Sequence, residues 1–292
     1  MGADASGWEF TDDRGAALRL PRRPRRVVAY VRAGAALLDL GVVPVAVYGS
    51  GHDGDGLDPV KAGELGATGV PYLGPGRLLD GDPSGALGAV RADLVVDVTY
   101  DGKSGYALDE AVAEGLGVPM VALSVGGEVT LARILERFGG LGAGLLGAAS
   151  APEAPGSVAE AEMALASAAA SGRRPVVLAL SGAGPEQVHL ARPQAWPELA
   201  RMVELGVRIV EPGPGAGASW LTADWERAAE LRPDVVLVDS RANAVWPEGS
   251  EAYPEVWRAV VGGSRVVPWN PETPPSAVAF GRFFREVAAA LG

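Results

Sequence analysis

The sequence predicts an α/β protein with two lobes, each built on a mostly parallel sheet flanked by helices. Val- and Leu-rich runs of four to six residues alternate with helical stretches along most of the 292 residues. This alternation is typical of parallel strands that helices cover on both faces. A helical stretch over 150–174 separates two blocks of nearly equal size. We therefore expect an N-terminal lobe over 1–149, a rigid bridging helix within 150–174 and a C-terminal lobe over 175–292.

The predicted bridging helix has sequence signals at both ends. Ser157 followed by Glu160 is a capping-box pattern, in which each side chain satisfies the backbone N–H of the other residue. Gly172 suits the left-handed residue that ends a helix, and Pro175 follows as a stop. Residues 158–171 would then form a rod of roughly 20 Å. The alternative is an ordinary crossover helix inside one long sheet.

Three sequence patterns occur in both blocks in the same order, which favours two lobes of similar topology over one long sheet. Each match alone is weak evidence, because similar patterns at the boundaries between strands and helices recur in any α/β protein. The preserved order is what gives the three matches their weight. The matched segments are 25–30 with 173–180, 40–47 with 205–210, and 90–98 with 231–239.

The first lobe begins with a predicted hairpin over 8–20, in which apolar residues flank a turn at 12–15. Short buried-type strands then alternate with helices, and Gly41 marks the end of the first helix. The predicted strands are 27–31, 44–48, 70–73, 94–98 and 120–123, and the predicted helices are 33–40, 87–90, 108–116 and 129–138. The second lobe repeats this alternation with strands at 176–180, 207–210, 235–238 and 265–267 and a last helix over 277–291.

Composition excludes several classes of partner and site. The net charge of −11 and the pI of about 4.8 argue against a nucleic-acid partner, which requires a basic face. Zero cysteines exclude disulfides and thiolate metal sites, and two histidines cannot supply a three-histidine zinc site. The one basic cluster, residues 21–26, is broken by prolines and leads into an apolar strand, so a solvated loop is favoured over a binding patch.

Ligand chemistry is expected at the carboxyl ends of the predicted strands, where open α/β sheets bind small molecules. Aromatic side chains with a few Arg and Lys suit a bulky, partly apolar, anionic ligand held by stacking and charge pairing. The alternative is that these aromatics pack loops onto the sheets. The candidates are Tyr30, Arg32, Tyr48, His52, Tyr100, Lys103 and Tyr106 in the first lobe, and Gln187, His189, Trp196, Trp220, Arg241, Asn243, Trp246, Trp269 and Asn270 in the second.

Catalytic patterns are absent from the sequence, so we expect no enzyme and no catalytic residues. The glycine-rich segments at 182–184 and 212–217 lack the G-x-G-x-x-G fingerprint and a Walker lysine. No G-x-S-x-G elbow occurs, and no spacing supports a pairing of Ser181 or Ser240 with His189. The acidic loop 53–58 lacks the glycine position and the closing glutamate of a calcium loop, so no metal site is expected.

A set of segments distributed from Trp8 to Leu291 carries a family resemblance through its order. The segments are WEFTDDRG, LPRRPRRVVA, LLDLGVVPVAVYG, ADLVV, VPMVALS, LLG, RPDVVLVD and WNPETPPSAVAFGRFF. In this order they resemble class III periplasmic substrate-binding proteins of ABC importers, which bind ferric siderophores, haem or cobalamin. The resemblance implies a bilobed fold with a rigid bridging helix, a ligand cleft between the lobes and little hinge motion.

The resemblance also implies docking on a permease through one glutamate per lobe, at the start of the helix before a P-D-[LV]-[VI] strand. In the second lobe Glu226, seven residues before Pro233, fits that position. The equivalent position of the first lobe is Gly85, with Asp80 and Asp82 just upstream. The first lobe therefore departs from the family pattern, and docking is expected through Glu226.

From the resemblance we expect a monomeric binding protein, without cofactor, that captures a ferric siderophore in the cleft and delivers it to an ABC permease. Too few imidazoles are present for a zinc or manganese ligand. Arg32, Lys103 and Arg241 would favour an anionic iron chelate. Haem and cobalamin remain open, and the candidate axial ligands for haem are Tyr48, Tyr100, Tyr106, His52 and His189.

The rival hypothesis is a cytosolic carrier or enzyme on the same fold. Gly85 and the amino terminus MGADASGWEF, which lacks a signal-peptide pattern, motivate it. An extracytoplasmic, membrane-anchored lipoprotein is expected if an upstream signal was removed, and a cytoplasmic protein otherwise.

Overall fold

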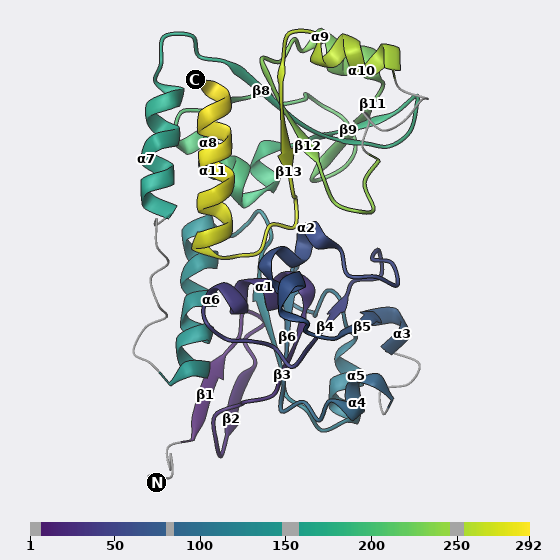
Figure 1. Ribbon diagram of the computed structural model, residues 1–292, viewed down its shortest axis with the longest axis vertical. Helices are drawn as coiled ribbons and strands as arrows, with labels where there is room; N and C mark the ends of the chain where they lie inside the picture. The colour runs from purple at the N-terminus through teal and green to yellow at the C-terminus, as the bar shows by residue number, and fades with distance from the viewer. Residues whose placement is uncertain (1–6, 80–84, 148–157, 246–253) are drawn as a thin grey trace. The chain divides into compact units, whose positions relative to one another are not determined.

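The computed structural model describes residues 7–79, 85–147, 158–245 and 254–292 and has the α/β fold that the sequence predicts. The chain divides into two compact units (Figure 1). The first unit comprises Met1–Ala154 and Glu272–Ser276, and the second comprises Pro155–Pro271 and Ala277–Gly292. The sequence prediction keeps each lobe contiguous, whereas residues 272–276 pack with the first unit although they follow the last strand of the second.

The first unit opens with the predicted hairpin, which is confirmed. Strands β1 (Trp8–Thr11) and β2 (Ala17–Leu20) pair antiparallel, with Trp8 opposite Leu20. The turn between them is held by Asp12, whose carboxylate accepts the N–H groups of Arg14 at 3.0 Å and Ala16 at 2.9 Å. A short polar side chain that satisfies its own turn is the usual reason for Asp at such a position.

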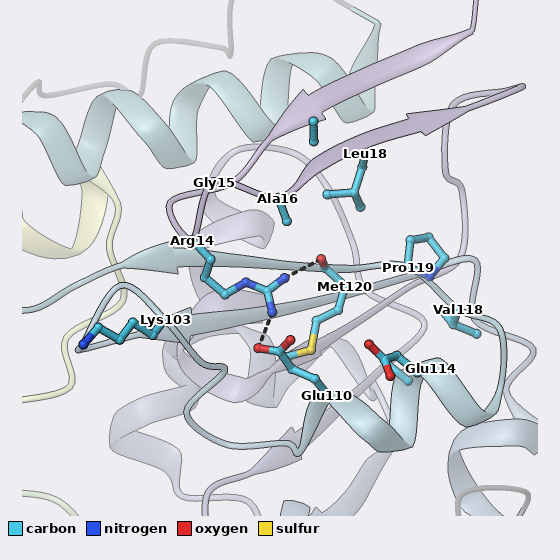
Figure 2. Close-up of a pocket in the computed structure, with 12 residues that line it drawn as sticks. Arg14, Gly15, Ala16, Leu18, Lys103, Glu110, Glu114, Val118, Pro119 and Met120 are labelled. Carbon is cyan, nitrogen blue, oxygen red and sulfur yellow. Dashed lines mark hydrogen bonds and ion pairs between the residues drawn. The ribbon is translucent and has the colours of Figure 1, made fainter.

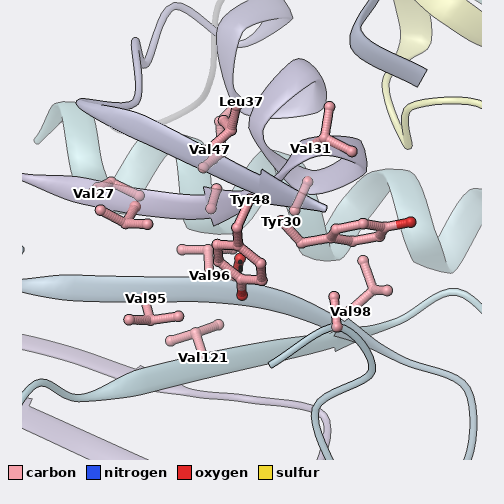
Figure 3. Packing of buried hydrophobic residues seen from close by; sticks show 14 of the residues in the cluster. Val27, Tyr30, Val31, Leu37, Val47, Tyr48, Val95, Val96, Val98 and Val121 are labelled. Atoms are coloured by element: carbon pink, nitrogen blue, oxygen red, sulfur yellow. Dashed lines mark hydrogen bonds between the residues drawn. The ribbon is translucent and has the colours of Figure 1, made fainter. Parts of the chain in front are cut away.

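The sheet of the first unit is parallel throughout, in the order β5-β4-β3-β6-β7. Its strands β3, β4, β6 and β7 are fully or largely buried, as the near-continuous apolar runs predict, whereas the edge strand β5 is half-buried. Figure 3 shows the valines and tyrosines that pack on this sheet. The strands are β3 (Val27–Tyr30), β4 (Ala46–Gly49), β5 (Tyr72–Pro75), β6 (Leu94–Thr99) and β7 (Met120–Ser124).

Short helices connect these strands, and one long helix follows them. Asp58, Asp109 and Thr130 act as N-caps by accepting hydrogen bonds from the first turn of the helix that each precedes. The elements are α1 (Val31–Asp39), α2 (Pro59–Ala62), η1 (Gly63–Thr68), α3 (Gly76–Leu79), α4 (Ala86–Ala89), α5 (Glu110–Gly115) and α6 (Leu131–Leu146).

Helix α6 begins two residues later and ends eight residues later than predicted, so the expected end at Phe138 is wrong. Its second half is rich in glycine, which lowers helix propensity but permits close packing. A Cβ on Gly142 would lie 3.1 Å from the side chain of Leu40, and one on Gly144 would lie 3.3 Å from Nε1 of Trp8. The packing of α6 against α1 and β1 therefore outweighs the local preference of the sequence.

The second unit contains a mixed sheet in the order β11-β9-β8-β12-β13, with β10 also paired to β8. Strands β8, β10, β12 and β13 are parallel, as predicted. Strands β9 and β11 add an antiparallel extension that the sequence does not signal. The strands are β8 (Val176–Gly182), β9 (Val188–Ala191), β10 (Arg208–Ile209), β11 (Trp220–Ala223), β12 (Val235–Asp239) and β13 (Arg265–Trp269).

Helix α7 (Val158–Ala169) packs against the last helix, α11 (Ala277–Leu291), inside the second unit (Figure 1). The bounds of α11 match the prediction. Ser157, the first residue of the proposed capping box, lies outside the described residues, and a bridging role for the helix stays a prediction. The other helices are η2 (Pro193–Ala195), α8 (Pro197–Glu204), α9 (Trp225–Glu230) and α10 (Pro254–Val261).

The sequence repeat corresponds to a structural repeat. The parallel order β4-β3-β6-β7 in the first unit recurs as β10-β8-β12-β13 in the second. The matched residues Arg91 and Arg232 both have positive φ, at 48° and 46°. Asp93 and Asp234, two residues later, both accept main-chain N–H groups at the start of the central strand, from Arg26 at 2.7 Å and from Val176 at 2.7 Å. The two units therefore share one strand topology.

Candidate functional site

Three tyrosines and an arginine gather at the carboxyl ends of β3 and β6 in the first unit. Tyr106 packs edge-on against both Tyr30 and Tyr100, with ring centroids 5.8 Å and 4.8 Å apart. Arg32 donates from Nη1 to the Tyr100 hydroxyl at 2.9 Å and from Nε to the Thr273 carbonyl at 3.1 Å. We call Tyr30, Arg32, Tyr100 and Tyr106 the tyrosine–arginine cluster. Tyr100 is 41% exposed, so it presents the most accessible ring of the four.

A buried ionic network supports this cluster. The Lys61 ammonium, fully buried, lies 2.7 Å from Asp53 Oδ1 and 2.8 Å from Glu272 Oε2. The Tyr30 hydroxyl donates to the same Glu272 oxygen at 2.5 Å. Burial and then the charge of Glu272 raise the pKa of Tyr30 well above its ordinary value, so its hydroxyl stays a donor. Sequence patterns did not identify Lys61 or Glu272, since the pairing spans two-thirds of the chain.

Asp97 holds the loop that carries Tyr106. Its carboxylate accepts the N–H groups of Val98 at 2.7 Å, and of Ala107 and Leu108 at 3.0 Å each. Burial raises the pKa of Asp97 to about 6 despite these donors. Tyr48 lies in the core beside Asp97 (Figure 3), and its pKa is raised well above its usual value by burial and then by the Asp97 charge. The structure therefore places Tyr48 within the sheet packing, apart from the exposed face of the cluster.

His52 and Lys103 are exposed in separate loops and do not join the tyrosine–arginine cluster. The Lys103 loop is fixed by Asp101, which accepts the N–H groups of Lys103 at 2.8 Å and Ser104 at 3.0 Å. These hydrogen bonds lower the pKa of Asp101 below its ordinary range.

Lys103 lines a different pocket, of about 570 Å³, beside the amino-terminal hairpin. Figure 2 shows Arg14 in that pocket between the Glu110 carboxylate and the Met120 carbonyl, to which it donates at 2.8 Å. Because Arg14 is bound to protein groups on both sides, the pocket has a largely neutralised wall.

Three tryptophans and a histidine gather in the second unit. Trp196 packs edge-on against Trp220 and Trp269, with ring centroids 4.9 Å and 5.4 Å apart. Trp220 and Trp269 are 5.7 Å apart, and His189 lies 6.3 Å from Trp220. We call Trp196, Trp220, Trp269 and His189 the tryptophan cluster. Trp269 is fully buried, whereas Trp196 and Trp220 are partly exposed.

The antiparallel extension of the sheet positions the tryptophan cluster. Strand β11 places Thr222 opposite His189 of β9, and the His189 Nδ1 lies 3.1 Å from the Thr222 hydroxyl. The indole of Trp269 donates to the buried Glu198 carboxylate at 3.0 Å, and that of Trp196 donates to the Ser219 carbonyl at 3.2 Å. The indole N–H groups of Trp196 and Trp269 are thus satisfied by protein, which leaves their ring faces for contact.

The remaining second-unit candidates are dispersed or bound. Arg241 forms a two-pronged ion pair with Asp239, at 3.0 Å from Nε and 2.7 Å from Nη2, so its charge is largely met. Gln187 is exposed in the turn between β8 and β9, and Glu226 is exposed in the first turn of α9. Asn243 is exposed and Asn270 is half-buried, and neither is part of the tryptophan cluster. Trp246 lies outside the described residues.

One residue that the sequence did not single out shapes this region. Arg192 donates to the carbonyls of Gly213 at 2.8 Å, Gly215 at 3.0 Å and Gly217 at 3.0 Å. These bonds fix the glycine-rich loop that leads into Trp220. Nothing in the sequence near Arg192 points to this role, because its partners are more than twenty residues away.

Two searches gave negative results within the described ranges. No group of three or more His, Cys, Asp or Glu side chains there is arranged to hold a metal ion. No helix among those residues has the length and apolar character needed to span a membrane.

Comparisons with known proteins place this fold. No protein-family model and no curated protein matches the chain. It is similar to DesE, a ferric-siderophore receptor protein from Streptomyces coelicolor, with a TM-score of 0.82 and 26% identity over 97% of each chain. It is also similar to the siderophore periplasmic binding protein from the fuscachelin gene cluster of Thermobifida fusca, with a TM-score of 0.64 and 15% identity over 93% of this chain and 97% of that one.

A haem-binding protein shows the same fold. The chain is similar to the periplasmic heme-binding protein RhuT from Roseiflexus sp. RS-1, with a TM-score of 0.58 and 15% identity over 91% of this chain and 97% of that one. Siderophore and haem binding proteins thus share the arrangement of strands and helices described above. The chain has the fold of class III periplasmic substrate-binding proteins of ABC importers, and the resemblance to that family seen in its sequence is confirmed.

Proposed function

We propose that this chain captures a ferric siderophore and delivers it to an ABC importer, without catalysis and outside the cytoplasm. The observation that carries the proposal is the likeness to a ferric-siderophore receptor across 97% of both chains. Neighbours of lower identity support the fold alone. The chelate, rather than a bare metal ion, is the proposed ligand.

The side chains of the two clusters suit such a ligand. A ferric siderophore is bulky, partly apolar and often anionic. The part-exposed rings of Trp196 and Trp220 offer faces for stacking on its organic shell. Arg32 is itself buried, but it donates to the hydroxyl of the exposed Tyr100 and so places positive charge close behind the ring that the ligand's oxygens would approach. We propose that each cluster supplies contacts to a ligand of this class, and that Arg241 makes no direct charge pair with it because Asp239 already binds its guanidinium.

Haem is the second candidate, and one observation favours it. The Tyr100 hydroxyl accepts a hydrogen bond from Arg32, an interaction that stabilises a phenolate. A phenolate can serve as an axial ligand to haem iron. The exposure of Tyr100 would allow this contact.

Delivery to a permease is proposed to use Glu226. Its side chain is exposed in the first turn of α9, as the family pattern requires. The first-unit counterpart, Gly85, is the N-cap of α4 and has no carboxylate to offer. At this pair of positions, only the second unit would therefore offer a carboxylate to the permease.

A fluorescence titration of the purified monomeric fraction tests the proposal. The panel contains ferric hydroxamates, ferric catecholates, ferric citrate, haem and cobalamin, and tryptophan quenching reports binding. Saturable quenching by one class of iron chelate supports the proposal and names the ligand. Binding of haem alone moves the assignment to the second candidate, and no binding across the panel overturns both.

Two variants test the clusters against a control. Trp220→Ala and Tyr100→Ala should each weaken binding by about fivefold, since each removes a ring contact worth roughly 1 kcal/mol. Trp257→Phe is the control, because Trp257 packs against Trp225 in a separate core. Unchanged affinity in Trp220→Ala with a normal melting temperature would contradict the assigned role of the tryptophan cluster.

A further inference from the structure

Four arginines surround a recess in the first unit, at the opposite end of β3 from the tyrosine–arginine cluster. The recess has a volume of about 490 Å³ and is lined by Arg22, Arg23, Arg25, Arg26 and Asp93. Four arginines less one aspartate give its lining a formal charge of +3, in a chain of net charge −11. The recess lies where β3 and β6 begin, whereas Tyr30 ends β3; Figure 3 shows Val27 and Tyr30 at opposite ends of this strand.

Two of the guanidinium groups are fixed by the fold. Arg26 donates from Nε to the carbonyls of Val90 at 3.1 Å and Arg91 at 3.0 Å, and from Nη2 to Val90 at 2.6 Å. Its Nη1 donors are not used in these bonds. Arg23 lies against Gly147 at the end of α6, where a Cβ would come within 1.4 Å of Nη1. Neither arginine needs to be ordered when a ligand arrives, which lowers the entropic cost of binding.

The other two guanidinium groups are available. The side chains of Arg22 and Arg25 are exposed and make no hydrogen bond or ion pair within the described part of the chain. Asp93 forms no ion pair with either of them, because its carboxylate accepts the main-chain N–H groups of Arg25 at 3.0 Å and Arg26 at 2.7 Å, and its charge only lowers the formal charge of the lining to +3. The positive charge of the recess is therefore left for a partner.

We propose that this arginine recess binds a phosphate group. Guanidinium forks match the oxygens of phosphate in pairs, and several of them converge here. Among the described residues, the lining includes no aromatic or aliphatic side chain that would recognise the body of an organic chelate. A compact oxyanion with more than one charged oxygen fits this chemistry. The phosphate comes either from a soluble phosphate ion or monoester, or from the headgroup of a phospholipid.

Paired variants of the full chain test the recess. Arg22→Gln with Arg25→Gln removes the two available guanidinium groups. Arg173→Gln with Arg174→Gln is the control, because these exposed arginines precede β8 as Arg25 and Arg26 precede β3 and the change in net charge is the same. Calorimetric titration with inorganic phosphate at low salt measures one source, and sedimentation with vesicles of phosphatidylglycerol or phosphatidylcholine measures the other.

The wild type and the control should bind one of the two probes, and the recess variant should bind it about tenfold more weakly, because two charge-assisted contacts are lost. Binding of phosphate identifies a soluble ligand, and binding to phosphatidylglycerol vesicles alone identifies a lipid headgroup. No binding of either probe by the wild type overturns the proposal. An equal loss in both variants also overturns it, because net charge would then explain the effect.

A circular-dichroism melt of each variant checks the fold. If the double variant melts early, Arg22→Gln alone replaces it, since that side chain makes no bond within the residues described and its loss should leave the fold intact. Unchanged phosphate and vesicle binding in Arg22→Gln would then overturn the proposal.

Discussion

Each unit buries an aspartate near the end of the strand beside its central strand, but the two acids have different partners. Asp97 accepts main-chain N–H groups and neighbours Tyr48, and no cation is among the groups that affect its pKa. Asp239 accepts the Ser181 hydroxyl at 2.9 Å and the two-pronged Arg241 guanidinium. In the matched segments 90–98 and 231–239 the two acids are one position apart, and adjacent strand residues face opposite sides. A shared strand topology therefore does not impose shared electrostatics.

The two aromatic clusters also differ in the polarity of the side chains that form them. In the first unit the cluster combines tyrosines with Arg32. The buried Lys61 ion-pair network supports it from below, so its buried side is polar. The second unit combines tryptophans, and Glu198 is occupied by an indole N–H. One unit thus offers hydroxyl groups and charge, and the other offers apolar ring faces. The two clusters therefore suit different chemical groups of a ligand.

The largest expected effect is the loss of the Lys61 ammonium. Lys61→Met leaves Asp53 and Glu272 buried without their cation, and breaking a buried pair in this way costs about 3–5 kcal/mol of unfolding free energy. Chemical denaturation measures the loss. Lys103→Met, an exposed lysine of the same unit, should change the free energy by less than about 0.5 kcal/mol. Similar losses in the two variants would refute the buried network.

A smaller effect is expected from Arg241→Met in the second unit. The buried Asp239 keeps its bond to Ser181 but loses the guanidinium, so we expect a loss of about 2 kcal/mol. Arg227→Met is a matched control, because Arg227 pairs with Glu230 at 3.3 Å on the surface. Such a surface pair contributes about 0.5 kcal/mol. If both variants lost the same amount in denaturation, the contrast between Asp97 and Asp239 would not hold.

The smallest effect is a pH dependence that belongs to the first unit. The pKa of Asp97 is raised to about 6 in the folded chain, against about 3.9 when unfolded. Between these values the folded state binds more protons, so this contribution to stability is present at low pH and lost as pH rises through about 6. From about pH 7 to pH 5 the wild type should gain about 1 kcal/mol relative to Asp97→Asn. Parallel pH profiles for the two proteins would contradict the shift.

Periodicity predicted the parallel strands well because the central ones, such as β3, β6, β8 and β12, are buried on both faces and read as apolar runs. The prediction failed where burial is one-sided. Strand β11, WLTA, is only half-buried, and β9 contains the polar His189, so neither stands out from a loop. The predicted end of α6 was wrong for another reason. Its glycines lower the local helix propensity, but they allow close packing against Leu40 and Trp8.

The rule that ligand-binding side chains lie at strand ends predicted both aromatic clusters. It did not predict how deeply each side chain is buried. Tyr30 and Tyr48 end neighbouring strands, and both are fully buried, yet only Tyr30 joins the cluster that reaches the surface through Tyr106. The supports of the clusters, Glu272 and Arg192, depend on contacts between distant segments. No pattern local to those residues signals such contacts, so the sequence alone could not identify them.

The return of residues 272–276 to the first unit has a consequence for how the protein is made. A ribosome completes the strands of the first unit long before it reaches Glu272, the residue that pairs with Lys61 and Tyr30. Until then a lysine destined for full burial has only Asp53 as its ionic partner. We therefore expect the amino-terminal unit to finish folding only after nearly the whole chain has been translated, although domains at the amino terminus usually fold first.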